Sequence, residues 1–565
     1  MYLKRSISEN KEQSWRLIMR LLALFRPYGG WMVLGLLVSL AASLSSIILL
    51  GISGWFITAM GLAGVAGASI NYFTPAAIIR ACAIVRTGGR YGQQLITHEA
   101  TFRLIARLRR WFYDCLEPLS PAGIGYLKSG DLFSRIRSDI DILERFYLRF
   151  LVPAGVALLV SIIIVTVLFF YSRSLAFSVG GILVFAGFLL PFWAFWLSQE
   201  TEHDLVNQHA NLRADLSGHL SGMGELLIYD LDGKFEQEIN EKNVDVQRSK
   251  ETLHKRMAIA ENLNGLFASS AMFVTLGFSF YLLTREKIGS EIFVMLPLLV
   301  FACFEAITVM PSAFQGLGGV LRAAERIFDI SDQKPSVKDP VEQRSVPSRF
   351  DIIFQDVNFS YQTEGLPVLE NLNFTLKAGE KMAIIGPTGC GKSSIVNLLM
   401  RFYESQSGNI LIGEHNIGEY RGEDVRQAFS VLPQKPYIFN ATIRQNLLYA
   451  NNQASQKEID EAMKQAGLFE FVEGLPLKYD TSIGEHGKAL SGGQIKRLAL
   501  ARALLKKTSC LILDEPGEGL DYEMERDILQ RVINNLNSAS LILISHRDNG
   551  LEDMDQILSL EEKDI

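Results

Sequence analysis

The segment from Trp31 to Ile79 contains no charged residue. A helix needs about 20 consecutive, mainly apolar residues to cross the hydrocarbon core of a bilayer. The segment therefore has room for one complete span, a short loop rich in glycine and polar residues at residues 61–71, and the start of a second span. A chain with such a segment is expected to be embedded in a membrane.

Four further apolar segments bring the predicted number of spans to six. They are residues 150–172, 174–199, 263–284 and 292 to about 317. Short links join the third span to the fourth and the fifth to the sixth, whereas long charged links follow the second and the fourth. Because loops rich in Lys and Arg stay in the cytoplasm, we place the long links and the N-terminus there. Residues 1–30 are interpreted as an amphipathic cytoplasmic helix, not as a cleaved signal peptide.

Charged residues also occur where the membrane is expected. Arg86 and Arg90 lie four residues apart in or near the second span, and His98 follows further along. Glu305 interrupts the sixth span. Charges at such positions are costly and usually face a cavity or a partner. The two arginines and the histidine share much of one helical face, where they could bind an anionic ligand or haem iron. A snorkelling interfacial face with a structural histidine is the alternative.

Residues 329–348 are polar, contain three prolines and show no apolar period, which indicates a linker. Before it lies the transmembrane domain at residues 1–328. After it, at residues 349–565, the pattern changes to short strands and helices. The predicted fold class is therefore an all-α membrane domain with six helices, followed by an α/β domain.

The sequence GPTGCGKSS at residues 386–394 stands between an apolar strand and an apolar-periodic helix. In that context it is predicted to bind phosphate, because glycines let backbone N–H groups turn toward phosphate oxygens. Lys392 supplies a cation for the β- and γ-phosphates, and the Ser393 hydroxyl can hold Mg²⁺. The residues assigned to the nucleotide from this loop are Gly386, Thr388, Gly389, Gly391, Lys392, Ser393 and Ser394.

Residues further along the chain complete a site that can hydrolyse a nucleotide. Gln434 ends an apolar run, and its side chain can reach Mg²⁺ and the attacking water. Asp514 and Glu515 end the strand LILDE, where Asp514 suits the metal, together with Ser393 and Gln434, and Glu515 suits a general base. His546 follows the next apolar strand and could align the water against the γ-phosphate.

Tyr361 ends a strand ahead of the phosphate loop, and its ring could stack on an adenine base. Ordinary packing within a β-sheet is the alternative explanation for a tyrosine at that position.

A second anion-binding helix start is predicted at LSGGQ. Its residues Ser491, Gly492, Gly493 and Gln494 open the helical stretch IKRLALARALL. A serine and two glycines at a helix N-terminus present backbone donors to an anion. One chain therefore carries two phosphate-binding helix starts. A single γ-phosphate fits between them if two copies of the domain face each other head to tail.

Charge and cysteine content limit the remaining classes of function. The formal net charge of −6 argues against a nucleic-acid-binding surface. The 5 cysteines lie far apart, without a CxxC pair or metal-ligand spacing, and Cys390 and Cys510 fall inside the nucleotide motifs. This pattern predicts a reducing cytoplasmic face and no disulfide framework.

The ordered set of Tyr361, GPTGCGKSS, Gln434, LSGGQ, LILDE and His546 resembles the nucleotide-binding domain of an ABC transporter. With six spans in front of it, the chain resembles a half-transporter of the exporter type. The membrane half resembles the CydC family, whose members are subunits of CydDC exporters, and the resemblance covers nearly the whole chain. Its motifs are ISGWF at residues 52–56, NYFTPAAIIRACAIVRTGGRY at 71–91, THEATFR at 97–103 and SPAG at 120–123.

The resemblance implies a heterodimer with a CydD-like half-transporter in the bacterial inner membrane, a multi-pass topology and a cytoplasmic nucleotide-binding domain. The family is required for assembly of cytochrome bd oxidase, and has been described as exporting cysteine and glutathione and as binding or moving haem. Its haem-associated histidine lies in the segment that matches THEATFR, which puts this role on His98, near Arg90. ATP, Mg²⁺ and haem are thus the implied ligands.

Two other functions stay open on the sequence. A haem-responsive regulatory or assembly ATPase would use the same motifs to change shape without net transport. A lipid or drug exporter would show an apolar cavity without the cluster of Arg86, Arg90 and His98.

Two features depart from the family pattern. After Glu515 the chain has PGEGLD instead of the usual PTSALD-like run, so we expect Gly517 and Glu518 to alter communication across the dimer, although Asp521 keeps its place. Only 19 residues follow His546, which predicts a C-terminally short nucleotide-binding domain that keeps all of its catalytic motifs.

Overall fold

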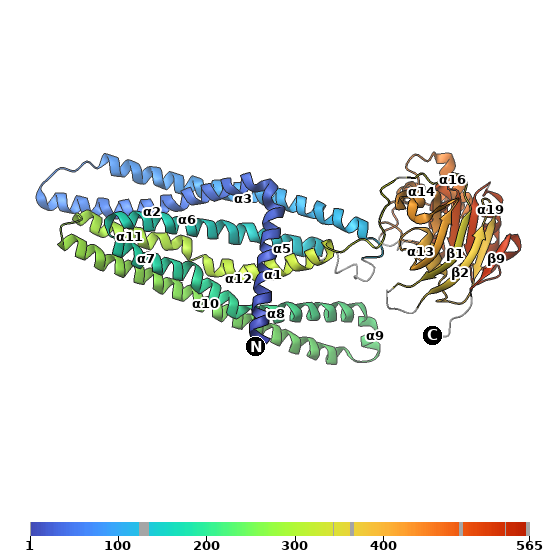
Figure 1. Ribbon diagram of the computed structural model, residues 1–565, viewed down its shortest axis with the longest axis horizontal. Helices are drawn as coiled ribbons and strands as arrows, with labels where there is room; N and C mark the ends of the chain where they lie inside the picture. Colours follow the sequence, from blue (N-terminus) through green and yellow to red (C-terminus); the bar gives the residue numbers. More distant parts are fainter. Residues whose placement is uncertain are drawn as a thin grey trace. The chain divides into compact units, whose positions relative to one another are not determined.

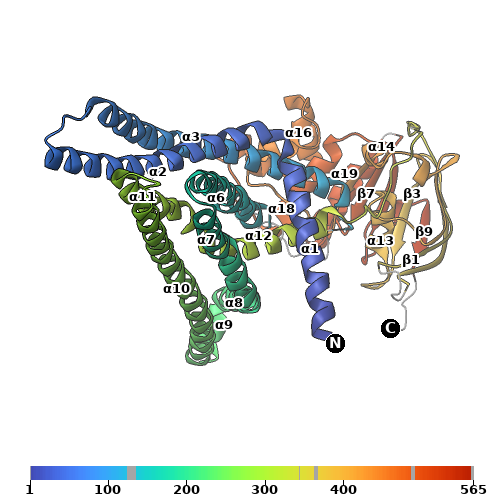
Figure 2. The same ribbon diagram turned by 60° about the vertical axis from the view of Figure 1, so that its left-hand side comes forward.

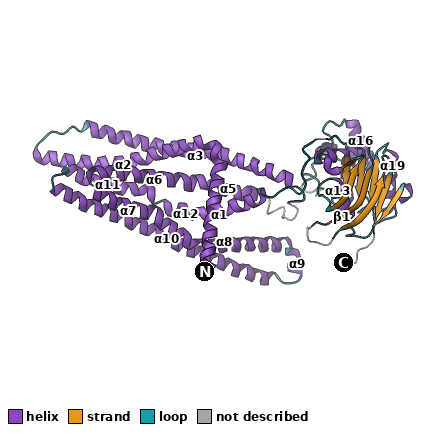
Figure 3. Cartoon of the chain, in the orientation of Figure 1, coloured by secondary structure: helices purple, strands orange, loops and turns teal. Residues whose placement is uncertain are grey.

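The computed structural model describes residues 2–123, 135–342, 344–361, 367–484, 490–536 and 538–560, and at residues 2–13, 135 and 203 it describes the backbone alone. The chain forms two compact units, the first made of residues 1–117 and 127–333 and the second of residues 118–126 and 334–565. The described part of the first unit is helical, and all described strands belong to the second unit (Figure 3).

Helices build the described part of the first unit (Figure 1). They are α1 (Tyr2–Phe25), α2 (Gly29–Ala66), α3 (Phe73–Leu116), α5 (Ile140–Arg145), α6 (Val152–Tyr171), α7 (Arg173–Val184), α8 (Leu190–Ser221), α9 (Met223–Ile228), α10 (Asp232–Thr284), α11 (Ser290–Ile307) and α12 (Met310–Ser331). Short 3₁₀ or π segments connect some of them, at η1 (Arg26–Tyr28), η3 (Arg135–Asp139), η4 (Phe146–Leu151) and η5 (Phe185–Leu189). The last helix, α12, runs to Ser331, inside the segment predicted as a linker.

All six predicted spans lie on these helices. Within the described residues, 5 helical stretches are long and apolar enough to cross a membrane, namely Ser14–Ala66, Ile136–Tyr171, Arg173–Ser221, Asp232–Thr284 and Ser290–Ser331. Helix α3, which carries most of the second predicted span, is not among them, because Arg80, Arg86 and Arg90 lower its hydropathy. It is nevertheless a continuous helix of 44 residues, and it packs along α2.

Small residues let helices α2 and α11 approach closely. A Cβ atom added at Gly51 would lie 3.4 Å from Leu299, and one at Gly54 would lie 2.5 Å from the Leu298 side chain. Small residues at helix contacts are typical of membrane proteins, in which packing replaces the hydrophobic effect as the driving force. Both glycines lie against leucine side chains of α11, so the two helices pack in close contact.

Helix α12 is held by charged side chains on two sides. Arg322 pairs with Glu202 of α8 at 2.9 Å, and both residues are largely buried. Arg326 binds Asp139 of η3 through two nitrogens, at 2.6 and 2.9 Å. Such bidentate pairs fix orientation as well as distance. The pairs therefore set the position of α12 against the rest of the helical unit.

The second unit contains two sheets (Figure 2). The antiparallel sheet has the order β2-β1-β4-β5, and its strands are β1 (Ile352–Phe359), β2 (Leu369–Leu376), β4 (Ser407–Ile412) and β5 (His415–Asn416). The parallel sheet has the order β6-β7-β8-β3-β9, and its strands are β3 (Lys381–Ile385), β6 (Phe429–Leu432), β7 (Cys510–Asp514), β8 (Ser540–Ile544) and β9 (Gln556–Ser559).

Helices cover the parallel sheet on both faces. They are α13 (Lys392–Leu399), α14 (Gly422–Ala428), α15 (Ile443–Leu448), α16 (Gln456–Gln465), α17 (Phe469–Glu473), α18 (Gly492–Leu505) and α19 (Tyr522–Asn534). Along β7, Ile512 belongs to the core shared with α13 and the antiparallel sheet, whereas Leu511 and Leu513 belong to the core shared with α15, α16 and α18. Successive strand residues point to opposite faces, so this strand, apolar up to Asp514, is buried on both sides, as a central parallel strand must be.

Candidate functional site

The predicted nucleotide residues gather at one edge of the parallel sheet. Strands β3, β6, β7 and β8 run in the same direction, so their carboxyl ends share that edge. The loops that follow these strands carry residues 386–391, Gln434, Glu515 and His546. Ligands in open α/β sheets bind outside the carboxyl ends of the strands. The topology therefore brings together motifs that are far apart in the sequence.

The phosphate loop depends on its glycines. Gly386, Gly389 and Gly391 have φ angles of 155°, 90° and 101°, a region that side chains disfavour. A Cβ at Gly391 would also lie 2.6 Å from a methyl group of Leu369. The buried Lys392 donates from Nζ to the carbonyls of Gly386 at 2.6 Å and Pro387 at 2.8 Å. The lysine is thus held inside the curve of the loop, where the phosphates are expected.

Ser393 and Asp514 form a pair that fits Mg²⁺. The Ser393 hydroxyl donates to Asp514 Oδ2 at 3.1 Å. Burial raises the pKa of Asp514, and the neighbouring Glu515 adds to this, while the Ser393 hydrogen bond and Lys392 oppose it. A buried carboxylate beside a hydroxyl is the oxygen-rich donor set that Mg²⁺ prefers. A divalent cation bound here would offset the cost of burying the charge.

Glu515 lies between two of the other predicted residues. Gln434 Nε2 donates to Glu515 Oε2 at 2.9 Å, and His546 Nδ1 lies 3.4 Å from Glu515 Oε1. Its side chain is mostly buried, and its backbone takes a left-handed φ of 50°. Strained backbones of this kind persist where the surroundings hold them, often at active sites. The carboxylate is thereby fixed in one position, as a general base requires.

Tyr361 remains accessible, with 47% of its surface exposed. Its hydroxyl pairs with Ser394 Oγ at 3.0 Å and accepts from Asn397 Nδ2 at 3.0 Å. Its ring makes edge contacts with Phe359 and Tyr403. These contacts fix the ring beside α13 and leave part of it exposed, so the placement is compatible with base stacking and with ordinary packing.

The LSGGQ motif opens α18 as the sequence predicts. Ser491 Oγ accepts from Gln494 N at 3.3 Å, and the Gln494 side chain accepts from Ser491 N at 2.8 Å. This reciprocal pair is a capping box, and Gly492 and Gly493 form the first turn. Among the described residues, no side-chain hydrogen bond joins this helix start to the phosphate loop of the same chain.

Sequence reasoning missed Lys496, which lies on α18 and is only 7% exposed. Its Nζ donates to the Glu515 carbonyl oxygen and to Glu518. A lysine just after LSGGQ, combined with a glutamate just after the catalytic strand, is the signal that would have found it.

The membrane charges fall in two groups. Arg90 donates through Nη2 to Glu305 of α11, and these two residues line a cavity of about 250 Å³ with Ser39, Ser43 and Gln93. Neither Arg86 nor His98 is among the described residues that line it. His98 is exposed on α3, where its ring lies 6.1 Å from that of Phe102. The structure thus brings Arg90 together with Glu305 and separates His98 from them.

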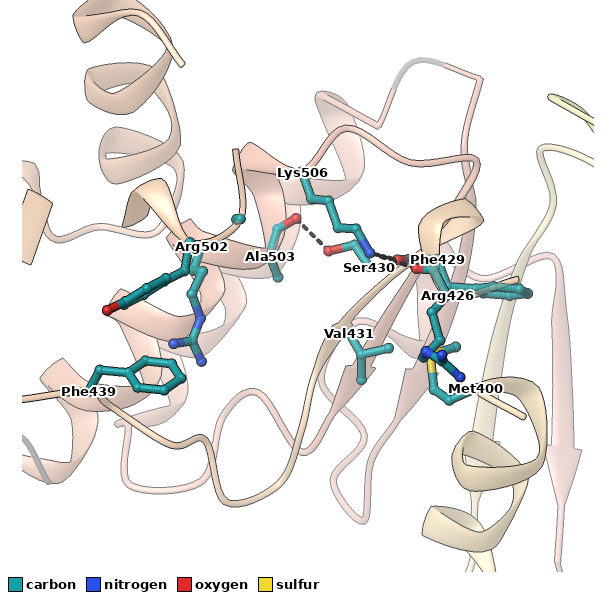
Figure 4. Close-up of a pocket in the computed structure, with 11 residues that line it drawn as sticks. Met400, Arg426, Phe429, Ser430, Val431, Phe439, Arg502, Ala503 and Lys506 are labelled. Carbon is teal, nitrogen blue, oxygen red and sulfur yellow. Dashed lines mark hydrogen bonds between the residues drawn. The ribbon is translucent and has the colours of Figure 1, made fainter. Parts of the chain in front are cut away.

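A cavity of about 360 Å³ in the second unit has a different character (Figure 4). Its Lys506 donates to the carbonyls of Arg426 and Phe429 at 2.6 and 2.7 Å, and Ser430 donates to the Ala503 carbonyl at 2.6 Å. Burial lowers the pKa of Lys506, and so does Arg426. None of the predicted nucleotide residues is among the described residues that line this cavity. Its Lys506 and Ser430 side chains are already bonded to main-chain carbonyls.

Family comparison divides the chain as the fold does. Residues 30–307 match the family described as ABC transporter transmembrane region, and residues 369–518 match the family described as ABC transporter. The chain also resembles the solved structure of a bacterial Atm1-family ABC exporter with ATP bound, with a TM-score of 0.83, 21% identity, and coverage of 95% of this chain and 94% of that one. That likeness concerns the fold.

Two named relatives are similar over most of their length. The glutathione/L-cysteine transport system ATP-binding/permease protein CydC of Escherichia coli is 34% identical over 551 residues, which cover 97% of this chain and 96% of the relative. The glutathione/L-cysteine transport system ATP-binding/permease protein CydD of Bacillus subtilis is 28% identical over 494 residues, which cover 86% of this chain and 85% of the relative. The similarity thus extends across both units.

Proposed function

Because this chain belongs to the CydC family of ABC transporters, we propose that it is one half of a heterodimeric exporter that uses ATP to move glutathione and cysteine. It is a multi-pass membrane protein and a transporter ATPase. We further propose that its substrates are thiols, that its partner is a second half-transporter, that the pair lies in the bacterial inner membrane, and that it supports cytochrome bd assembly.

The observation that carries the proposal is the complete hydrolytic set around Glu515. ATP binding would turn Lys392 from the loop carbonyls to the β- and γ-phosphates, while Ser393 and Asp514 would hold Mg²⁺. Glu515 would accept the proton of the attacking water, which Gln434 and His546 orient from either side of the carboxylate. Because these positions are all intact, we expect the chain to turn over ATP, and not only to bind it.

The partner is proposed to be a CydD-like half-transporter. The LSGGQ helix start has no described side-chain hydrogen bond to its own phosphate loop, and it can therefore close on a nucleotide held by a second domain. The similarity of this chain to a CydD protein over 86% of its length supports a pair of related halves. Two ATP molecules would then lie between the two nucleotide-binding domains.

The cavity beside Arg90 is proposed to receive the thiol. Glutathione and cysteine each carry an ammonium group and at least one carboxylate. Arg90 has donors beyond the one that binds Glu305, and Glu305 keeps a second oxygen. Ser39, Ser43 and Gln93 add hydroxyl and amide groups, and the volume suits a small ligand. A lipid or drug exporter would not need opposite charges at such a position.

Haem is proposed as a second ligand, through His98. The exposed imidazole beside Phe102 is accessible to a planar ligand, as an axial histidine has to be. Because His98 is not among the residues that line the thiol cavity, haem would bind at a separate place. Haem spectra of the wild-type complex and the His98→Ala variant test this: loss of the Soret shift in the variant is expected, and an unchanged shift contradicts it.

The experiment that tests the main proposal uses the chain co-purified with its partner half in lipid vesicles. We expect ATP-dependent accumulation of labelled glutathione or cysteine, and none with the Glu515→Gln variant. Haem-stimulated ATP hydrolysis without accumulation of either thiol would instead favour the regulatory ATPase.

A further inference from the structure

The loop between Glu515 and Asp521, called here the 515–521 loop, is where the chain departs from the usual PTSALD-like sequence. It connects the catalytic glutamate to α19, and two of its unusual residues have specific contacts. A Cβ at Gly517 would overlap the carboxylate of the buried Glu525. Glu525 in turn accepts hydrogen bonds from Arg547 and Asn549, both at 3.0 Å. One side of the loop is therefore fixed against α19.

The other side of the loop is held by Lys496 of α18. Lys496 Nζ donates to the main-chain oxygen of Glu515 at 2.9 Å and to Glu518 Oε2 at 2.7 Å. The same Glu515 oxygen accepts from Glu518 N at 3.3 Å. Lys496 thus bridges the backbone of the catalytic residue and the side chain of the unusual glutamate.

The lysine end of the bridge is buried, whereas the glutamate end is half exposed. The Lys496 side chain is 9% exposed and that of Glu518 is 52% exposed. An ammonium group removed from water needs hydrogen-bond acceptors and a counter-charge, and Glu515 O and Glu518 provide both. With an uncharged residue at position 518, the lysine would lose its counter-charge. This pairing gives a physical reason for a glutamate at that position.

A second contact joins α18 to the 515–521 loop. Gly493, in the LSGGQ motif, would place an added Cβ 3.1 Å from the Gly519 carbonyl oxygen and 3.1 Å from the Leu520 side chain. The first turn of α18 therefore lies directly against the 515–521 loop. A displacement of this helix start cannot leave the loop where it is, because proteins are packed without spare space.

We propose that Lys496 is a positioning residue that links the LSGGQ helix to the catalytic glutamate, with Glu518 as its counter-ion. The inference rests on the proposed head-to-tail pairing, in which α18 closes on the nucleotide of the partner half while Glu515 acts on the chain's own nucleotide. Movement of α18 at one ATP site is then passed through Lys496 to the left-handed backbone of Glu515 at the other site. The two sites are coupled by contact.

The test compares variants of this chain in the complex with its partner half, reconstituted in lipid. Lys496→Gln removes the ion pair, Lys496→Arg keeps the charge and the donors, and Glu518→Gln removes the counter-charge. Lys507→Gln is the matched control, because Lys507 pairs with Glu458 in the same unit at 2.5 Å and touches no predicted site residue in the described structure. For each variant, kcat and KM for ATP, binding of a fluorescent ATP analogue, and the unfolding temperature are measured.

We expect Lys496→Gln to lower kcat by about 10-fold, in the range of couplings between sites, with KM, nucleotide binding and unfolding temperature close to wild type. Lys496→Arg should recover most of the rate, and Lys507→Gln should leave it unchanged. Combining Lys496→Gln with Glu518→Gln should cost no more than Lys496→Gln alone, since both remove the same bridge.

Other results would overturn the inference. A wild-type kcat in Lys496→Gln, or a loss of rate that follows a lower unfolding temperature or weaker nucleotide binding, would show that the lysine acts only on the fold or not at all. A different result would contradict the proposed thiol substrate, namely ATP turnover by the wild-type complex without accumulation of a thiol. That result would leave the comparison of the Lys496 variants valid.

Discussion

Arg20 and Asp332 form a bidentate ion pair in which both nitrogen–oxygen distances are 2.6 Å, although their positions in the sequence differ by 312. Arg20 lies on α1, and Asp332 directly follows α12. The Arg20 guanidinium also lies 3.9 Å from the centroid of the Phe328 ring. The N-terminal helix is therefore attached to the last helix of the membrane unit (Figures 1 and 2).

Replacing Arg20 should cost more stability than replacing Asp332. Both side chains are about half exposed, so the ion pair itself contributes about 0.2–1 kcal/mol. Arg20→Ala loses in addition the contact with Phe328, which adds about 0.5–1 kcal/mol. Thermal unfolding of the two single variants and the double variant in detergent would measure this. Equal effects of Arg20→Ala and Asp332→Ala would contradict a contribution from the ring.

Arg401 should be important for the stability of the second unit. Its side chain is 1% exposed and donates to Asp339 at 3.1 Å, to the Lys338 carbonyl at 2.6 Å and to the Tyr420 carbonyl. Arg401→Met would leave the two carbonyls without this donor, at about 1–3 kcal/mol for each buried group. Asp339→Asn keeps both carbonyl bonds and is the milder control. Limited proteolysis of the full chain should show earlier cleavage within residues 334–560 for Arg401→Met only.

The sequence predicted the second unit well because each motif there is local. GPTGCGKSS, LSGGQ and LILDE each specify their own turn or cap, and the apolar runs beside them form the strands β3, β7 and β8. A parallel sheet then brings the carboxyl ends of the strands together. Knowledge of the motifs was therefore almost sufficient to bring the predicted nucleotide residues together at one edge of the sheet.

The membrane unit was predicted less completely, because its important contacts are not local. The sequence grouped Arg90 with Arg86 and His98 by their spacing along one helix, whereas the structure pairs Arg90 with Glu305 of another helix. The partner of Arg326 likewise cannot be read from helical periodicity. Such pairs depend on how helices pack, which the period of a single helix does not specify.

The cavity proposed for the thiol predicts unequal effects for two neighbouring arginines. Arg90→Gln and Glu305→Gln each remove one charge from the cavity and should raise the KM for glutathione transport by about 10-fold or more, since charged hydrogen bonds contribute about 1.5–3 kcal/mol. Arg86→Gln, one helical turn away and not among the described lining residues, should change KM little. Vesicle uptake at varied glutathione concentration measures this. An equal rise in Arg90→Gln and Arg86→Gln would point to the net charge of α3 and not to the cavity.

A pH effect is expected at Glu458. The hydrogen bond from Lys507, followed by those from Ser455, lowers the pKa of this carboxyl from its ordinary 4.5 to about 2. Because the folded pKa is the lower one, the contribution to stability is complete above 4.5 and is lost as the pH falls toward about 2. The difference in unfolding temperature between wild type and Lys507→Met should therefore shrink between about pH 6 and about pH 3. A constant difference over this range would contradict the assignment.

Asp514 offers the sharpest test of the metal site, because burial disfavours its charged form while the hydrogen bond from Ser393 favours it. Burial makes the carboxylate unfavourable and raises its pKa, while Ser393, 3.1 Å away, stabilises it only in part. Asp514→Asn keeps the size and can still bond the Ser393 hydroxyl, but it removes the charge that a divalent cation needs. We expect ATP hydrolysis to fall by about 10²–10⁴-fold while the unfolding temperature without nucleotide is maintained or rises, because a buried charge has been removed.

In wild type, Mg²⁺ together with ATP should raise the unfolding temperature more than ATP with a chelator does, and in Asp514→Asn the two should be equal. If Mg²⁺ still added stability in the variant, Ser393 and the phosphates alone would hold the metal, and Asp514 would serve the strand and not the ion.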